Sequence, residues 1–173
     1  MLRRKLFLVL LGNDKHGKGH IIRPLVTLME PHLEKPPKGR RRLQLRPGCL
    51  VDSYIFIRSY QEYEQPDYGD DIGRCLDAND ADWRQRDLLL MPSHIELNHL
   101  GAMIDIAHAA GFSAVVAYIL MSHGEIANYG GALQLNWDER WEIWNFTNQN
   151  FWEVQCSSIG NSLMWRIFRW ICS

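Results

Sequence analysis

The residues with the clearest chemical potential form a glycine-bounded segment near the N-terminus, Gly12-Asn13-Asp14-Lys15-His16-Gly17-Lys18-Gly19. It fits the pattern G-x-x-x-x-G-K of phosphate-binding loops, except that Gly19 stands where Ser or Thr is usual. Gly12 and Gly17 permit a tight turn that points backbone amides at a polyphosphate, and Lys18 can reach its outer phosphates. The residues expected to contact phosphate are Gly12, Asn13, Lys15, His16, Gly17, Lys18, Gly19 and His20.

The elements on either side of this loop are those that a phosphate site needs. Residues 6–11 form a continuous apolar run, typical of a strand that is covered on both faces. From His20 to Glu30 apolar residues recur at helical spacing, and such a helix points its positive end at a bound anion. The competing interpretation is a strand-to-helix turn that uses glycine for geometry and leaves its lysines in solvent.

The loop resembles that of a known enzyme family. Gly-Asn-Asp-x-x-Gly-Lys after a strand is similar to the phosphate loop of thymidylate kinases, and Gly17-Lys18-Gly19 is similar to the Gly-Lys-Gly-Thr of adenylate kinases. Both belong to the P-loop nucleoside monophosphate kinases. The resemblance extends to Glu30 and implies that Lys18 grips phosphate, that Asp14 lies near the phosphate acceptor, and that the cofactor is ATP or GTP with Mg²⁺.

The chain also departs from that family pattern. His20 stands where the adenylate kinases have Thr, so neither position 19 nor position 20 offers a hydroxyl to Mg²⁺. No residue is therefore assigned as a metal ligand. His94, Glu96 and His99 do not have the spacing of a metal motif, and capping or surface roles are favoured for them.

Further strands and helices predict the fold class. Strands are expected at residues 51–57, 87–91 and 114–120, and a helix at residues 97–110. Pro92 is expected to end its strand, and Ser93 to cap the helix in a capping box with Glu96. This order predicts one α/β domain over residues 1–173, with a mostly parallel sheet and helices on both faces. The resemblance implies a P-loop NTPase-like version of that fold.

Loops that follow parallel strands meet at one edge of the sheet, where ligands bind. Arg58 follows the second predicted strand and is the candidate to steady a transferred phosphoryl group. A surface ion pair with Glu62 or Glu64 is the equally weighted alternative for Arg58. The catalytic candidates are thus Lys18, Asp14 and Arg58.

Two other stretches stand out by composition. Residues 31–47 are rich in proline and basic residues and are expected to form an exposed connection; without interleaved aromatic residues, they do not favour nucleic-acid binding. Residues 137–173 hold all but one of the 7 tryptophans. Trp137, Trp141 and Trp144 lie at i, i+4, i+7 and predict a helix, as does the pattern at residues 163–171. We expect these helices to pack in the core or to contact a second copy or a protein partner.

Bulk composition excludes several classes of protein. With 46% hydrophobic residues the chain is expected to be globular, and its formal net charge of -1 provides no global field for nucleic acid or membrane. No window reaches the roughly 18 apolar residues of a membrane span. The 4 cysteines contain no CxxC pair, so reduced thiols in a cytoplasmic protein are expected.

The sequence leaves two functions open. The first is a small nucleotide-kinase-like phosphotransferase in which Lys18 and the loop amides hold the donor phosphates. The second is a catalytically degenerate nucleotide-binding module that docks a partner through its Trp-rich C-terminus. The missing hydroxyl after Lys18 favours the second, and the glycine pattern favours the first.

Overall fold

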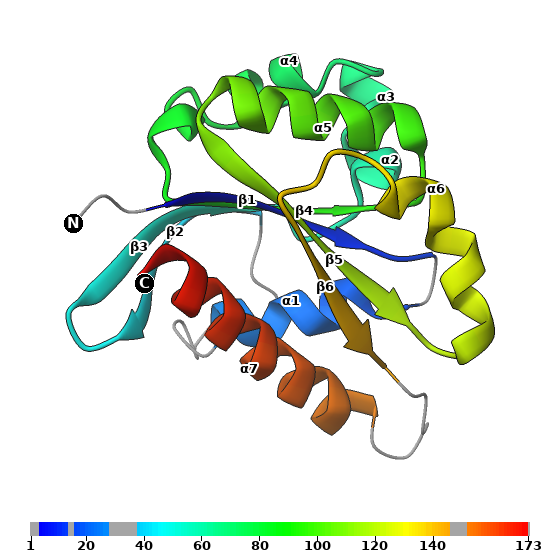
Figure 1. Cartoon of the computed structure of the whole chain (residues 1–173). Coiled ribbons are helices and arrows are strands. Elements are labelled where there is room, and N and C mark those ends of the chain that lie inside the picture. Colours follow the sequence, from blue (N-terminus) through cyan, green and yellow to red (C-terminus); the bar gives the residue numbers. More distant parts are fainter. Residues whose placement is uncertain (1–3, 14–15, 28–37, 146–151, 173) are drawn as a thin grey trace.

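A six-stranded sheet organises the chain (Figure 1). The computed structural model describes residues 4–13, 16–27, 38–145 and 152–172. The strand order across the sheet is β2-β3-β4-β1-β5-β6. The strands are β1 (Lys5–Leu11), β2 (Gly39–Arg46), β3 (Cys49–Ile55), β4 (Leu88–Ser93), β5 (Phe112–Leu120) and β6 (Glu139–Trp144). All neighbours pair parallel except β2 and β3, which are antiparallel.

Helices cover both faces of the sheet, which confirms the predicted α/β class with a mostly parallel sheet (Figure 1). One face carries α1 (Lys18–Thr27) and α7 (Trp152–Ile171). On the other face, α4 (Ile72–Asn79) and α5 (Leu97–Ala109) pack against the sheet. The short elements are α2 (Tyr60–Tyr63), α3 (Gln65–Tyr68), α6 (Gly130–Leu133) and the 3₁₀ helices Trp83–Gln85 and His123–Tyr129.

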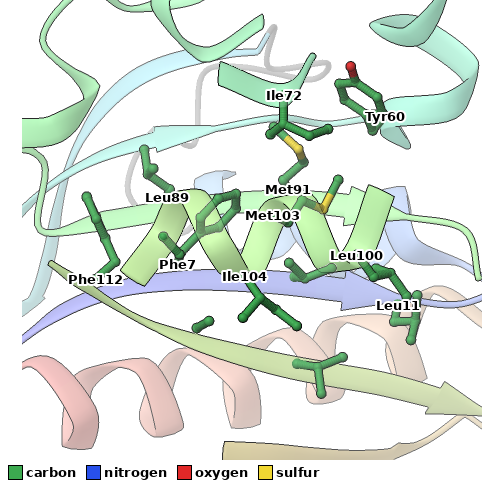
Figure 2. Packing of buried hydrophobic residues seen from close by; sticks show 14 of the residues in the cluster. Phe7, Leu11, Tyr60, Ile72, Leu89, Met91, Leu100, Met103, Ile104 and Phe112 are labelled. Atoms are coloured by element: carbon green, nitrogen blue, oxygen red, sulfur yellow. The ribbon is translucent and has the colours of Figure 1, made fainter. Parts of the chain in front are cut away.

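The core consists of two clusters, one on each face of the sheet. Strand β1 contributes to both, because successive side chains of a strand point to opposite faces. Phe7 and Leu11 pack beneath α5, against Leu100 and Ile104 (Figure 2). The alternate residues Leu6, Leu8 and Leu10 pack under α1 and α7. This two-sided burial explains the continuous apolar run at residues 6–11.

Helices α1 and α7 pack closely at Gly160. A Cβ atom at Gly160 would lie 2.8 Å from the Ile21 carbonyl oxygen and 3.1 Å from Pro24 Cβ. Because no side chain fits there, the backbone of α7 can lie directly on α1. Helix α1, whose first turn follows the glycine-bounded loop, is therefore held in place by direct contact with α7.

The expectation of an exposed connection over residues 31–47 was wrong in its second half. Residues 31–37 lie outside the described residues, but Gly39–Arg46 forms edge strand β2, in a hairpin with β3. The Pro47-Gly48 turn joins the two strands, and Leu43 is buried while Arg40 and Arg42 are exposed. Alternating burial is typical of a strand, and here it outweighs the proline and charge content.

The predicted helix at Trp137–Phe146 was also wrong, because β6 occupies Glu139–Trp144. Trp141 and Ile143 are buried while Arg140 and Glu142 are exposed. Tryptophans four and three residues apart fit a helix, but the polar residues between them alternate with period two. The helix predicted at residues 163–171 is confirmed as the C-terminal part of α7.

Pro92 does not end its strand, and Ser93 does not cap the next helix. Both belong to β4, and α5 begins later with Glu96 as its N-cap residue. The Leu90 carbonyl accepts a hydrogen bond from Phe56 N–H, so Leu90, and with it Pro92, presents its backbone to the β3 side. Strand β3 ends at Ile55, so the missing N–H of Pro92 removes no ladder hydrogen bond.

The cysteines differ from expectation. A disulfide joins Cys49, at the start of β3, to Cys172, just after α7, whereas Cys75 and Cys156 are free and buried. The expectation of reduced thiols was therefore wrong for one pair. Among the described residues, no helix combines the length and the apolar character that crossing a membrane requires.

Candidate functional site

The glycine-bounded loop lies at a position of the sheet where ligands commonly bind. It follows β1, which lies between β4 and β5. The helix after β1 packs on one face, and the helix after β4 packs on the opposite face. Adjacent strands whose connections diverge in this way leave a crevice at their carboxyl ends. The loop begins at this crevice, where Gly12 N–H donates to the Ser93 carbonyl over 3.2 Å.

The loop curls around the side chain of Lys18. The Lys18 ammonium donates to the carbonyls of Gly12, at 2.6 Å, and Asn13, at 3.0 Å. Lys18 is only 8% exposed although it opens helix α1. Gly17 has a φ of 79°, in the left-handed region that glycine adopts without strain. The loop thus holds a cation at the positive end of a helix, which favours a bound anion.

A hollow of about 270 Å³ opens beside Lys18. We call it the loop hollow; the residues lining it are Asn13, His16, Gly17, Lys18, Gly19, Ile57, Arg58, Ser59 and Glu62. Pockets for whole small molecules usually measure about 300 to 1,000 Å³. The loop hollow is therefore suited to phosphate groups, with the rest of a larger ligand outside it.

Arg58 lines the same hollow, as expected from its place after β3. Its guanidinium lies 4.9 Å from the centre of the Tyr63 ring. The predicted alternative, an ion pair with Glu62 or Glu64, does not occur among the described residues: Glu62 lies 3.2 Å from His94, and Glu64 pairs with Lys38. The structure therefore brings Lys18 and Arg58 together, two cations around one small space.

His16 has a different place from the one expected. His16 is among the residues that line the loop hollow, but it is buried, and its Nδ1 lies 3.3 Å from both the Ile119 carbonyl oxygen and the Tyr129 hydroxyl. The Asn145 side-chain amide donates to the His16 carbonyl over 3.1 Å. His16 thus anchors the loop to the ends of β5 and β6. Asp14 and Lys15 lie outside the described residues, and His20 is exposed on the first turn of α1.

Tyr129 and Asn145 were not predicted as site residues. Burial raises the pKa of Tyr129 above its ordinary value, so its hydroxyl stays protonated and donates to the Ile119 carbonyl. Tyr129 stands directly before Gly130-Gly131, which begins α6. The sequence around Asn145 carries no signal of its role, because the contact with His16 spans 129 positions.

The polar cluster around His99 does not form a metal centre. His99 Nε2 lies 2.8 Å from Asp70, and Nδ1 lies 3.0 Å from Glu96 and 3.1 Å from the Gln61 amide. The two carboxylates contact opposite edges of the ring, so they do not converge on one point. Across the part of the chain that the structure describes, no group of three such side chains could hold a metal ion.

A larger hollow of about 600 Å³ lies near the other end of the sheet. It is lined by Arg4, Glu139, Trp141, Arg166, Phe168, Arg169, Trp170 and Cys172. None of the loop residues borders it. Its arginines are exposed on the surface, whereas Lys18 is buried within a shaped loop, so we place the candidate site at the loop hollow.

Comparison with models of known protein families and with curated proteins found no match to this chain. The site is therefore defined by its own geometry. A buried lysine, a glycine-bounded loop and an exposed arginine meet at the carboxyl end of the central strands.

Proposed function

We propose that residues 12–19 bind the phosphates of a nucleotide, and that the chain is a P-loop NTPase-like phosphotransferase that uses ATP or GTP. The observation that carries this proposal is the placement of Lys18. Its ammonium is held within the loop by the Gly12 and Asn13 carbonyls while it borders a hollow that Arg58 also lines.

The arrangement suits phosphoryl transfer, which depends mainly on positioning and on neutralising charge. Lys18 is oriented in advance by two hydrogen bonds, so little side-chain entropy is lost when phosphate binds. Arg58 approaches from β3 and offers a fork of donors to a phosphoryl group. Asp14 is proposed, from the family resemblance, to lie near the acceptor. The position of the loop beyond the central strand β1 is also where a nucleotide phosphate would lie in a P-loop fold.

The second candidate is a nucleotide-binding module without turnover that docks a partner through its C-terminus. The observation that favours it is Trp165, which is 58% exposed on α7; Val154, nearer the start of the same helix, is exposed as well. Trp137 and Trp141 are buried in the core. A docking surface would therefore be formed by α7 and not by the whole Trp-rich stretch.

Thermal unfolding with ATP, GTP and their Mg²⁺ complexes tests nucleotide binding. A ligand at 100 times its Kd should add about 2.7 kcal/mol of stability, which shifts the Tm by several degrees. Lys18→Ala should abolish the shift. Lys5→Ala is the matched control, because Lys5 lies at the other end of β1 and also donates to a backbone carbonyl, that of Arg84.

The two candidates differ in turnover. A phosphotransferase releases or transfers γ-phosphate steadily, and Lys18→Ala removes this activity while Lys5→Ala keeps it. Binding without turnover in the presence of Mg²⁺ and candidate acceptors supports the module. If no nucleotide shifts the Tm of the wild-type protein, both candidates fail and the loop is a structural turn.

A further inference from the structure

Ser59 is a buried hydroxyl at the edge of the candidate site. It follows Arg58 directly, is 1% exposed, and lines the loop hollow with Lys18. Its Oγ has no hydrogen-bond partner among the described residues. Although Ser59 is the N-cap residue of α2, its side chain makes no capping hydrogen bond. The structure of the described chain thus gives this oxygen no role in folding.

A buried polar group without a partner destabilises a protein, and native structures contain few of them. A serine hydroxyl has one donor and two acceptor lone pairs, and its staggered rotamers are related by rotation about one bond. The Ser59 Oγ is itself buried, so rotation about this bond is what would bring the unsatisfied hydroxyl to a ligand in the hollow. Without a ligand, the unsatisfied Ser59 hydroxyl lowers the stability of the fold and forms no hydrogen bond with the described residues that offsets this loss.

The loop hollow is also bordered by the motif position at which a hydroxyl is missing. Gly19 occupies the motif position at which Ser or Thr usually contacts Mg²⁺. A Cβ atom at Gly19 would lie 3.6 Å from the Ile57 carbonyl oxygen, so the first turn of α1 lies against the chain just before Arg58-Ser59. Ile57, Gly19 and Ser59 all border the loop hollow. The hydroxyl that α1 lacks is present on the neighbouring segment.

We propose that Ser59 Oγ supplies the Mg²⁺ of a bound nucleotide with the oxygen ligand that Gly19 and His20 cannot provide. This inference rests on the proposed function. The chemistry of the donors fits, because Mg²⁺ is usually held by one or two protein oxygens together with substrate phosphates and water. Glu62 also lines the hollow and carries a carboxylate, one oxygen of which lies 3.2 Å from His94 Nε2. Bound Mg²⁺ would neutralise phosphate charge, while Lys18 and Arg58 position the phosphates.

Ser59→Ala tests the inference through binding, separately from activity. The Kd for ATP is measured by thermal unfolding in EDTA and again in Mg²⁺. We expect Ser59→Ala to leave the Kd in EDTA unchanged and to weaken binding in Mg²⁺ by about tenfold or more, since even outer partners of a metal contribute about 10- to 100-fold. The apo Tm should stay constant or rise, because alanine removes an unsatisfied hydroxyl.

Ser53→Ala is the matched control. Ser53 is also buried on β3, but its Oγ donates to the Arg41 carbonyl over 3.0 Å. This variant should lower the apo Tm and leave the Mg²⁺-dependent change in Kd as in the wild type. The opposite responses of two buried serines separate loss of a ligand oxygen from loss of a structural hydrogen bond.

Restoring the hydroxyl on α1 provides the second test. Gly19→Ser, added to Ser59→Ala, should recover most of the lost Mg²⁺-dependent affinity, because the oxygen returns to its usual motif position. Gly101→Ser, in a position of α5 with open space around it, should recover none. Recovery also shows that the single variant was folded and otherwise competent.

The outcomes are distinct. If Ser59→Ala keeps the full Mg²⁺ effect, or loses ATP binding equally in EDTA, Ser59 is not the metal ligand and the inference is overturned. If wild-type protein binds no nucleotide in either condition, the proposed function itself has failed. Normal binding in EDTA that Lys18→Ala abolishes, combined with an unchanged Mg²⁺ effect in Ser59→Ala, would overturn the inference alone.

Discussion

Two arginines at opposite ends of the sheet have different surroundings: Arg86 is buried in a network of ion pairs, and Arg58 is exposed beside the loop hollow. Arg86 precedes β4 and is 3% exposed. It binds both oxygens of Asp80, at 2.7 and 2.8 Å, and also Asp52, at 2.9 Å. Arg58 follows β3, is exposed, and stacks on Tyr63 without an ion pair among the described residues. Arg86 lies in the ion-pair network at the end of the sheet where β4 begins, which we call the closed end. Arg58 borders the loop hollow at the opposite end, which we call the open end.

Electrostatics reinforces this difference. Hydrogen bonds to Arg86 lower the pKa of Asp80 below its ordinary value, although burial opposes the shift. Burial alone would raise the pKa of Asp52, but hydrogen bonds and charge from Arg40 and Arg86 leave it lowered. The charges of Arg86, Asp80 and Asp52 thus compensate one another. At the loop hollow, the cations Lys18 and Arg58 outnumber Glu62, the one carboxylate among the described residues that line it, and this is why we propose function there.

The largest expected effect is the loss of stability in Arg86→Ala. Removing one partner of a buried ion pair leaves uncompensated charge and typically costs about 3 to 5 kcal/mol. We expect a fall of this size in the free energy of unfolding, measured by urea denaturation. Asp52 and Asp80 would then lose the same partner, so Arg86→Ala combined with Asp80→Asn should cost less than the sum of the two single changes. Full additivity would contradict a shared network.

Arg58→Ala should show the reverse behaviour. An exposed arginine without an ion pair contributes little to folding, so the free energy of unfolding should change by about 0.5 kcal/mol or less. Loss of a charge-assisted hydrogen bond to phosphate costs about 1.5 to 3 kcal/mol, or roughly 10- to 100-fold in affinity for ATP. Arg58→Lys, which keeps the charge but not the fork of donors, should fall between. A large loss of stability with unchanged ATP affinity would reverse our assignment of the two arginines.

The sequence predicted the open end of the sheet better than its edges. Gly17 has a φ of 79°, a conformation that glycine adopts without strain, so its residue type already indicates a turn. The apolar run of β1 can likewise be recognised without knowledge of distant contacts. The edge strands β2 and β6 were not predicted, because proline and charge content in one and tryptophan spacing in the other were given more weight than alternation with period two. In β6, the spacing of Trp141 and Trp144 fits a helix, and only the intervening Arg140 and Glu142 indicate period two.

The details of the site depend on contacts that sequence patterns do not contain. Ser59 is 1% exposed although it follows the exposed Arg58, and its residue type does not indicate this burial. The anchoring of His16 by Tyr129 and Asn145 spans more than a hundred positions. Arg86 lies close to Asp80 and Asp87 in the sequence, but its pairing with Asp52 follows from the register of β3 beside β4.

The position of α1 offers a way to separate the loop from its support. A Cβ atom at Gly160 would clash with the Ile21 carbonyl, so Gly160→Ala forces α7 away from α1 and should cost about 1 to 3 kcal/mol. Urea denaturation measures this cost. Because the clash lies where α1 contacts α7, at Ile21 and Pro24 and not at the loop itself, we expect the ATP affinity at temperatures well below the Tm to stay within about twofold. A large loss of affinity would show that the loop geometry depends on helix packing.

The smallest expected effect is a dependence of stability on pH from Asp80. Its pKa is lower in the folded protein than the ordinary value of 3.8, so its contribution is fully present above about pH 4 and is lost as the pH falls below the folded value. Each unit of lowering corresponds to about 1.4 kcal/mol. The difference in free energy of unfolding between wild type and Asp80→Asn should therefore shrink as the pH falls below 4. Asp77 pairs with Arg84 on the surface, where solvent screens the charges, so Asp77→Asn should show a smaller change over the same range. Equal changes for both variants would mean that burial adds no stability to the ion pair between Arg86 and Asp80. The contrast between the buried Arg86 and the exposed Arg58 would then have no physical basis.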